Sequence, residues 1–144
     1  MTKIISFISQ KSFFEKTTLA RALAHELSQK RKVLLADCDK ERENSYDWLN
    51  LHKKNNIDIK IFSTIQKAIR ESKKYDFAVI DGPSETNHYS LELAQASSII
   101  LQPINSLPND LEAAINFFNI LVKKGVKKSK LVFILNKVND FSED

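Results

Sequence analysis

The chain is organised around the segment Ile4-Ile5-Ser6-Phe7-Ile8-Ser9-Gln10-Lys11-Ser12-Phe13-Phe14-Glu15-Lys16-Thr17-Thr18. The apolar run over 3–9 predicts a short strand that is buried on both faces. A helix is expected from Lys16, because Leu19, Leu23 and Leu27 recur every fourth residue. A strand that leads through a short loop to Lys-Thr-Thr at a helix start is typical of a phosphate-binding loop. The loop nevertheless contains no glycine, so the sequence leaves nucleotide binding itself as the central question.

The bulk composition predicts one domain over 1–144. The chain has 144 residues, 42% of them hydrophobic and 28% charged, and a net charge of +4. No apolar run approaches the ~18–20 residues of a membrane span, and the first residues lack the pattern of a signal peptide. The single cysteine, Cys38, is typical of a reducing compartment, so we expect a cytoplasmic protein without membrane association. Whether further chain follows residue 144 in the natural product stays open.

The rest of the chain alternates between apolar strand patterns and helical patterns. We expect strands over 33–36, 57–61, 77–80, 98–102 and 131–135, with the strand over 98–102 stopping at Pro103. We expect helices over 44–53, 64–74 and 88–96, and another after Pro108 that is capped by Asn109 or Asp110 and ends at Gly125. The buried face of this last helix is predicted as Leu111, Ala114, Ile115, Phe118, Leu121 and Val122. Such alternation predicts an α/β fold, in which a parallel β-sheet is sandwiched by helices.

Polar residues gather where these strands end. Asp37 and Asp39 follow the second strand, Asp81 ends the fourth, and Asn136 ends the last. Ligands of open parallel sheets bind at the carboxyl ends of the strands. The sequence therefore predicts one polar site there, in which Asp37 and Asp81 could converge on a metal ion beside Lys16 and Thr17.

These motifs resemble the deviant Walker A ATPases of the partition and cell-division type, the family of ParA, Soj and MinD. The family's Lys-Gly-Gly-x-Gly-Lys-Thr-Thr is matched by Lys11-Ser12-Phe13-Phe14-Glu15-Lys16-Thr17-Thr18, and its Asp-x-Asp by Asp37-Cys38-Asp39. Its Walker B strand is similar to Tyr75-Asp76-Phe77-Ala78-Val79-Ile80-Asp81-Gly82-Pro83, and its Asn-Lys turn to Asn136-Lys137. The motifs occur in the family's order from Met1 to about Val138.

The resemblance implies a P-loop NTPase-like fold of the deviant Walker A type, ATP and Mg²⁺ as cofactors, and a role for each matched position. Lys11, Asp37 and Asp39 would be catalytic, with Lys11 reaching the partner's phosphates across a nucleotide-sandwich dimer. The nucleotide-binding positions would be Lys11, Glu15, Lys16, Thr17, Thr18 and Asn136, and the metal positions Thr17, Asp37 and Asp81.

Physical chemistry opposes part of this assignment. Glycines let a phosphate loop adopt φ > 0 and approach the phosphate oxygens, and a side chain forced into the left-handed region costs roughly 1–2 kcal/mol per residue. Ser12, Phe13 and Glu15 stand where the family has glycines. Glu15 also brings a negative charge: at ~5 Å and an effective dielectric of ~20, each like-charge pair costs about 3 kcal/mol.

The sequence thus leaves three functions open. The first is a ParA-like partition ATPase for plasmid or chromosome segregation, a dimer that binds DNA and a ParB-like stimulating protein. The second is a degenerate ParA-fold binding module that works without nucleotide or no longer hydrolyses ATP, supported by Ser12, Phe13 and Glu15. The third is a related metabolic or maturation enzyme. The sequence gives this reading no support, because it lacks the pair of cysteines that would hold a metal cluster. Titration with an ATP analogue would separate the first two.

Overall fold

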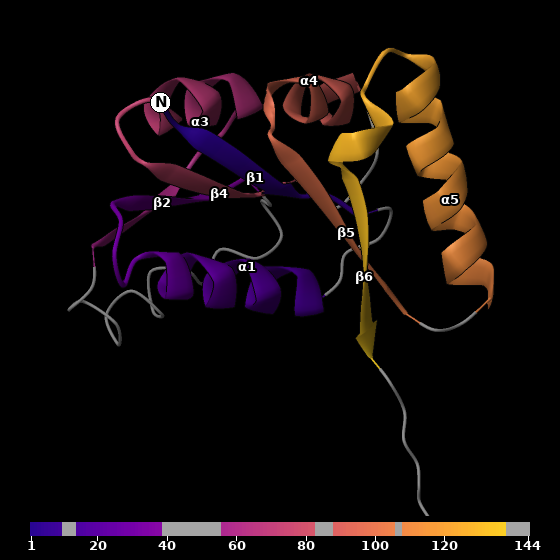
Figure 1. Cartoon of the computed structure of the whole chain (residues 1–144), viewed down its shortest axis with the longest axis horizontal. Coiled ribbons are helices and arrows are strands. Elements are labelled where there is room, and N and C mark those ends of the chain that lie inside the picture. The colour runs from indigo at the N-terminus through magenta and orange to yellow at the C-terminus, as the bar shows by residue number, and fades with distance from the viewer. Residues whose placement is uncertain (10–13, 39–55, 83–87, 106–107, 138–144) are drawn as a thin grey trace, which may run out of the picture.

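The computed structural model describes residues 1–9, 14–38, 56–82, 88–105 and 108–137. Strands and helices alternate along these residues, as the sequence predicted (Figure 1). The elements are β1 (Lys3–Phe7), α1 (Phe14–Leu27), β2 (Val33–Asp37), β3 (Ile57–Ile61), α3 (Ile65–Ser72), β4 (Phe77–Asp81), α4 (His88–Ala96), β5 (Ile99–Asn105), α5 (Pro108–Lys123), the short 3₁₀ helix η1 (Lys128–Lys130) and β6 (Leu131–Lys137). The helix expected over 44–53 lies outside the described residues.

The six strands form one parallel sheet in the order β3-β2-β4-β1-β5-β6. Figure 1 shows α1 on one face of the sheet and α3 and α4 on the other. Helix α5 belongs to the same face as α3 and α4, because its buried residues join the same apolar cluster. The expected α/β architecture, a parallel sheet between helices, is confirmed.

Two apolar clusters hold the layers together, one on each face of the sheet. One joins strand residues such as Leu34 and Ile80 to α3, α4 and α5, and the other joins Leu35 and Val79 to Ala20 and Ala24 of α1. Neighbouring strand residues therefore point into opposite clusters. This is why β2 and β4 are apolar throughout rather than alternating.

Strand β5 is longer than the sequence predicted. We expected it to stop before Pro103, but it continues to Asn105, and Pro103 is paired in register with Ile134 of β6. Strand β1 pairs with β5 only from Ile99 to Leu101. Pro103 therefore lies beyond the ladder with β1, where its missing N–H removes no hydrogen bond from that pair.

Both ends of α5 follow local backbone chemistry. The helix begins at Pro108 itself rather than after it, so Asn109 and Asp110 lie inside the first turn and neither is the cap. The fixed φ of proline suits the first helical position. The predicted C-terminal cap is confirmed: Gly125 has φ 102°, its N–H donates to the carbonyl of Val122, and the N–H of Val126 donates to that of Leu121.

The face that α5 buries differs from the prediction. Ala114, Phe118 and Leu121 are buried as expected, and so is Phe117. Leu111, Ile115 and Val122 are instead exposed, at 42%, 42% and 39%. The helix rests on β5 with its Phe117 side turned inward, so one flank of its apolar stripe is left in solvent.

Candidate functional site

The polar site lies where β1, β2 and β4 end and α1 begins. Parallel pairing puts Phe7, Asp81 and Asp37 in one row across these three strands. Asp37 and Asp81 are 1% and 2% exposed, so both carboxylates are taken out of water. The sequence predicted that they would lie at the same end of the sheet, and the register confirms this.

Lys16 is the cation of this site. It stands in the first turn of α1, and although lysine is rarely buried, this side chain is 0% exposed. Its Nζ donates to Oδ1 of Asp81 and, at 2.6 Å, to the carbonyl oxygen of Gly82. A buried ammonium needs such acceptors, because an isolated charge in the interior is very costly. Lys16 therefore joins the helix start to the end of β4.

Thr17 binds the second oxygen of the Asp81 carboxylate. Its side chain is buried, and its Oγ1 donates to Oδ2 of Asp81 at 2.8 Å. A hydroxyl and a carboxylate at this separation are oxygen ligands of the kind that Mg²⁺ takes from proteins. The described residues contain no cluster of three or more His, Cys, Asp or Glu side chains that could hold a metal by itself. Thr17 and Asp81 fit an ion that completes its shell with substrate oxygens and water.

The backbone around Asp37 is tied to the same strand ends. The carbonyl of Asp37 accepts from the N–H of Phe62, and the N–H of Cys38 donates to the carbonyl of Asp81, both at 2.9 Å. Asp37 is thus fixed beside Asp81 by the ladder and by these bonds.

Gly82 is a site residue whose role the sequence did not reveal. Its N–H donates to the carbonyl oxygen of Phe7 at 2.9 Å, and a Cβ at this position would lie only 2.7 Å from that oxygen. Glycine therefore lets β4 pass close to β1 while its own carbonyl accepts from Lys16. The available signal was composition, since only Gly82 and Gly125 occur in 144 residues and one of them follows Asp81.

Residues 5–143 match the family model of the CobQ/CobB/MinD/ParA nucleotide binding domain. The chain belongs to this family. A curated relative, the uncharacterized protein BBD21 of Borreliella burgdorferi, is 34% identical over 88 residues. That match covers 58% of the present chain and 36% of the relative, so the chain spans well under two thirds of the relative's length.

Solved structures share the fold of this family member at low identity. A plasmid partition protein of Borrelia burgdorferi B31 bound to AMPPNP has a TM-score of 0.74 and 22% identity, with 94% of this chain and 74% of that chain covered. MinD of Pyrococcus horikoshii complexed with Mg-ADP has a TM-score of 0.71 and 23% identity, covering 94% and 70%. The VpsO kinase domain also matches, with a TM-score of 0.74, 20% identity and coverage of 95% and 85%.

The structure brings together part of the set that the family resemblance predicted. Lys16, Thr17 and Asp81 are in contact, and Asp37 is adjacent in the sheet, whereas Thr18 is exposed. Asn136 belongs to β6, which is separated from β1 by β5, and only its backbone is described. Glu15 likewise lies in α1 with its side chain undescribed, and Lys11, Ser12, Phe13 and Asp39 lie outside the described residues. The roles of all these residues stay predictions.

A membrane-spanning segment is not found among the described helices, none of which is long and apolar enough.

Proposed function

We propose that this chain is a ParA-type plasmid partition protein that binds ATP with Mg²⁺ where α1 meets the end of β4. The observation that carries the proposal is the placement of Lys16 Nζ and Thr17 Oγ1 on the two oxygens of the buried Asp81 carboxylate. The solved partition protein bound to AMPPNP and MinD with Mg-ADP, which share this fold, support the choice of ligand.

Each residue of the contact has a role that its chemistry allows. Thr17 and Asp81 would hold Mg²⁺, which supplies positive charge to the phosphate oxygens when bound. Lys16 would release Asp81 and turn its ammonium to the phosphates. Asp37, in register with Asp81, would orient the attacking water. These roles use oxygen ligands and one flexible cation, all of which the site contains.

The wider activity follows from the resemblance. We propose that ATP binding switches a nucleotide-sandwich dimer in which Lys11 reaches the partner's phosphates, with DNA and a ParB-like stimulating protein as further partners in the cytoplasm. The net charge of +4 is compatible with contact to DNA.

A second candidate is a ParA-fold binding module that works without nucleotide. The hydrogen bonds of Lys16 within the protein favour this candidate, because the ammonium is fully buried and has both a carboxylate and a carbonyl as acceptors. Ser12, Phe13 and Glu15 at the family's glycine positions favour it as well.

The deciding experiment titrates the purified chain with a fluorescent ATP analogue and Mg²⁺. The comparison is a variant in which Ser12, Phe13 and Glu15 are all changed to glycine. We expect saturable binding by the native chain that is about a hundredfold weaker than that of the repaired variant, because one like-charge pair at Glu15 costs about 3 kcal/mol. Lys16→Ala should abolish saturable binding, and Lys67→Ala, at an exposed lysine of α3, should leave it unchanged. Binding by the repaired variant alone would favour the module.

A further inference from the structure

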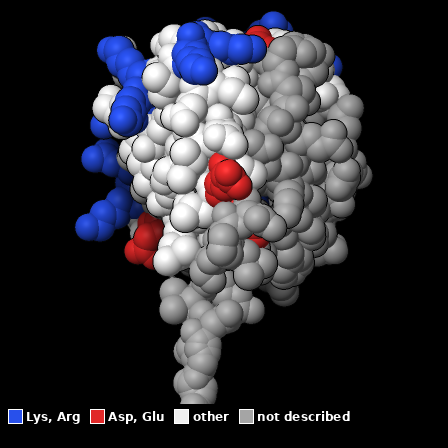
Figure 2. All heavy atoms as spheres, turned by 90° about the vertical axis from the view of Figure 1, so that its right-hand side faces the viewer, with Lys and Arg blue, Asp and Glu red and all other residues white. Residues whose placement is uncertain are grey.

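Lys16 differs from every other lysine and arginine side chain that the structure describes. Figure 2 shows such side chains on one side of the molecule, where they project from the surface along its upper and left borders. Among the described residues, all lysines and arginines other than Lys16 are at least partly exposed, whereas Lys16 is 0% exposed. A buried ammonium persists only with acceptors inside the protein. What Lys16 can bind therefore depends on how firmly those acceptors hold it.

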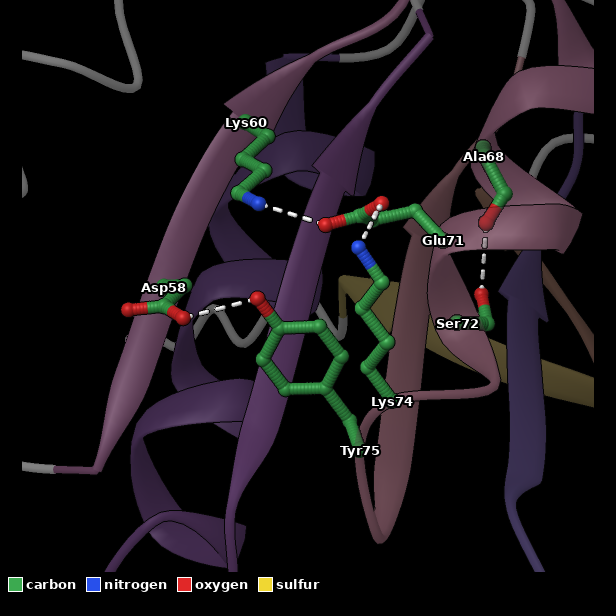
Figure 3. Close-up of polar contacts among 7 residues, drawn as sticks. All are labelled: Asp58, Lys60, Ala68, Glu71, Ser72, Lys74 and Tyr75. Atoms are coloured by element: carbon green, nitrogen blue, oxygen red, sulfur yellow. Dashed lines mark hydrogen bonds and ion pairs between the residues drawn. The ribbon is translucent and has the colours of Figure 1, made fainter.

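An exposed ion-pair network of the same chain provides the comparison (Figure 3). Lys60 Nζ donates to Oε2 of Glu71 at 2.6 Å, and Lys74 Nζ lies 3.3 Å from Oε1 of the same carboxylate. The side chains of Lys60 and Lys74 are 44% and 70% exposed, so water and salt compete with these pairs. The pair between Lys16 and Asp81 is buried on both sides and is screened much less.

The buried charges of the site do not cancel. Among the described residues, the buried side chains that carry a formal charge are Lys16, Asp37 and Asp81, which are one cation and two carboxylates. The two carboxylates are neighbours in the register of β2 and β4. A site with this balance attracts a divalent cation and repels a polyphosphate that arrives without one.

Both oxygens of the Asp81 carboxylate are already in use. Oδ1 accepts from Lys16 Nζ and Oδ2 accepts from Thr17 Oγ1. A metal ion that binds Asp81 beside Thr17 would lie close to the ammonium, and like charges at such a separation repel strongly in a buried site. Lys16 and the ion therefore cannot both hold this carboxylate at full strength.

We propose that Lys16 and a divalent cation compete for Asp81, so that the site takes Mg²⁺ and the triphosphate of a nucleotide together and binds either one poorly alone. This inference rests on the proposed function, in which Lys16 turns to the phosphates. While Asp81 holds Lys16, the ammonium is withheld from an anion. When Asp81 binds a divalent cation instead, Lys16 is released to the phosphates. The coupling is reciprocal, because each ligand strengthens the binding of the other by the same factor.

The first test measures the metal alone. The chain is titrated with Mn²⁺ in the absence of nucleotide, and the unbound ion is detected by electron paramagnetic resonance. Mn²⁺ takes the same kinds of oxygen ligand as Mg²⁺. Lys16→Met should tighten Mn²⁺ binding by at least about tenfold, because it removes the competing ammonium. Lys67→Met is the matched control, the same substitution at an exposed lysine of α3, and it should leave Mn²⁺ binding unchanged.

The second test measures binding of the fluorescent ATP analogue in EDTA. Asp81→Asn should bind the metal-free analogue at least about tenfold more tightly than the native chain does, because no carboxylate then withholds Lys16 from the phosphates. Thr17→Ala also removes a candidate metal ligand but leaves the pair of Lys16 with Asp81 in place. It should therefore not tighten metal-free binding. If Asp81 were a metal ligand only, neither substitution would tighten it.

A third measurement uses the native chain and does not depend on the folding of a variant. Lysine amines are acetylated with acetic anhydride in EDTA, and the modified positions are quantified by mass spectrometry. Lys16 should react at least about tenfold more slowly than Lys60 and Lys74, the lysines of the exposed network.

Three results would each overturn the proposal. The first is that Lys16 is acetylated as fast as Lys60, and the second is that Lys16→Met does not tighten Mn²⁺ binding. The third is that Asp81→Asn binds the metal-free analogue no better than a native chain that does bind it with Mg²⁺. Acetylation and the Mn²⁺ titration use no nucleotide, so they judge the competition even where the analogue fails to bind with Mg²⁺, a failure that counts against the proposed function instead.

Discussion

Replacement of Asp81 by asparagine tests whether the buried contact with Lys16 holds α1 to the sheet. The ammonium of Lys16 is 0% exposed, and Asp81 is its ionic partner. Removal of one partner from a buried ion pair costs about 3–5 kcal/mol, because the remaining charge is left uncompensated. The carbonyl of Gly82 would still accept from Lys16, so we expect Asp81→Asn to lower the free energy of unfolding by about 3 kcal/mol.

Urea unfolding measures this loss in the absence of nucleotide. With a slope of about 2 kcal/mol per molar urea, a loss of about 3 kcal/mol lowers the midpoint by about 1.5 M. Lys16→Met should cost a similar amount, since it leaves the Asp81 carboxylate buried without its cation. Thr17→Ala is the matched control in the same turn: it removes a hydroxyl donor to Asp81 and should cost about 1 kcal/mol.

The double variant Lys16→Met with Asp81→Asn distinguishes pairing from general disruption. If the two side chains stabilise the fold through each other, the double variant should lose less than the sum of the single losses, by about 2 kcal/mol. Additive losses, or a midpoint shift below about 0.5 M for Asp81→Asn, would refute the reasoning.

Two further substitutions test the surroundings of the sheet. Tyr75→Phe removes the hydroxyl that donates to Asp58 at 2.7 Å and should cost about 1 kcal/mol in urea unfolding. Burial, then the hydrogen bond and charge of Asp58, raise the pKa of Tyr75 from its ordinary value of 10.0 to about 12. A raised folded-state pKa adds stability below pH 10 that is lost as the pH rises toward about 12, so the native chain should lose stability over this window and Tyr75→Phe should lose less. Gly82→Ala should cost about 3 kcal/mol, the upper end of the usual cost of overpacking, because the new Cβ would lie 2.7 Å from a backbone oxygen of Phe7. Gly125→Ala, where the strain comes only from φ 102° in open space, should cost about 1 kcal/mol, and an equal or larger loss there would contradict the close-approach account of Gly82.

The alternating strands and helices of the parallel sheet could be predicted because each buried strand shows as a short apolar run and each helix as a separate periodic pattern. The extent of β5 could not, since Pro103 is tolerated only where β1 no longer pairs, and that depends on the neighbours of the strand. The buried face of α5 was ambiguous for a related reason. Both Phe117 and Leu111 are apolar, and the position of the helix on β5 decides that Phe117 is buried while Leu111 is exposed.

The candidate site was predictable in its residue types but not in its contacts. Motif order identified Lys16, Thr17 and Asp81 as one site, and the sheet register places Asp37 beside them. Nothing in the sequence shows that Asp81 receives both α1 donors, or that Gly82 supplies a carbonyl to Lys16. Such contacts depend on how α1 packs against the end of β4, which the residue types alone do not specify.

The contact between Lys16 and Asp81 bears on both candidate functions, because it balances the charge of the site. Lys16 and Asp81 neutralise each other in a site that excludes water, so Lys16 can turn to a phosphate only if another cation takes its place at Asp81. Mg²⁺ beside Thr17 would supply that charge, which couples nucleotide binding to the metal. Ser12, Phe13 and Glu15 stand at the family's glycine positions, which belong to the loop that would surround the phosphates and not to the contact between Lys16 and Asp81. We therefore propose that Lys16, Thr17 and Asp81 retain the helix-start half of a nucleotide site, and that residues 12, 13 and 15 decide whether it is used.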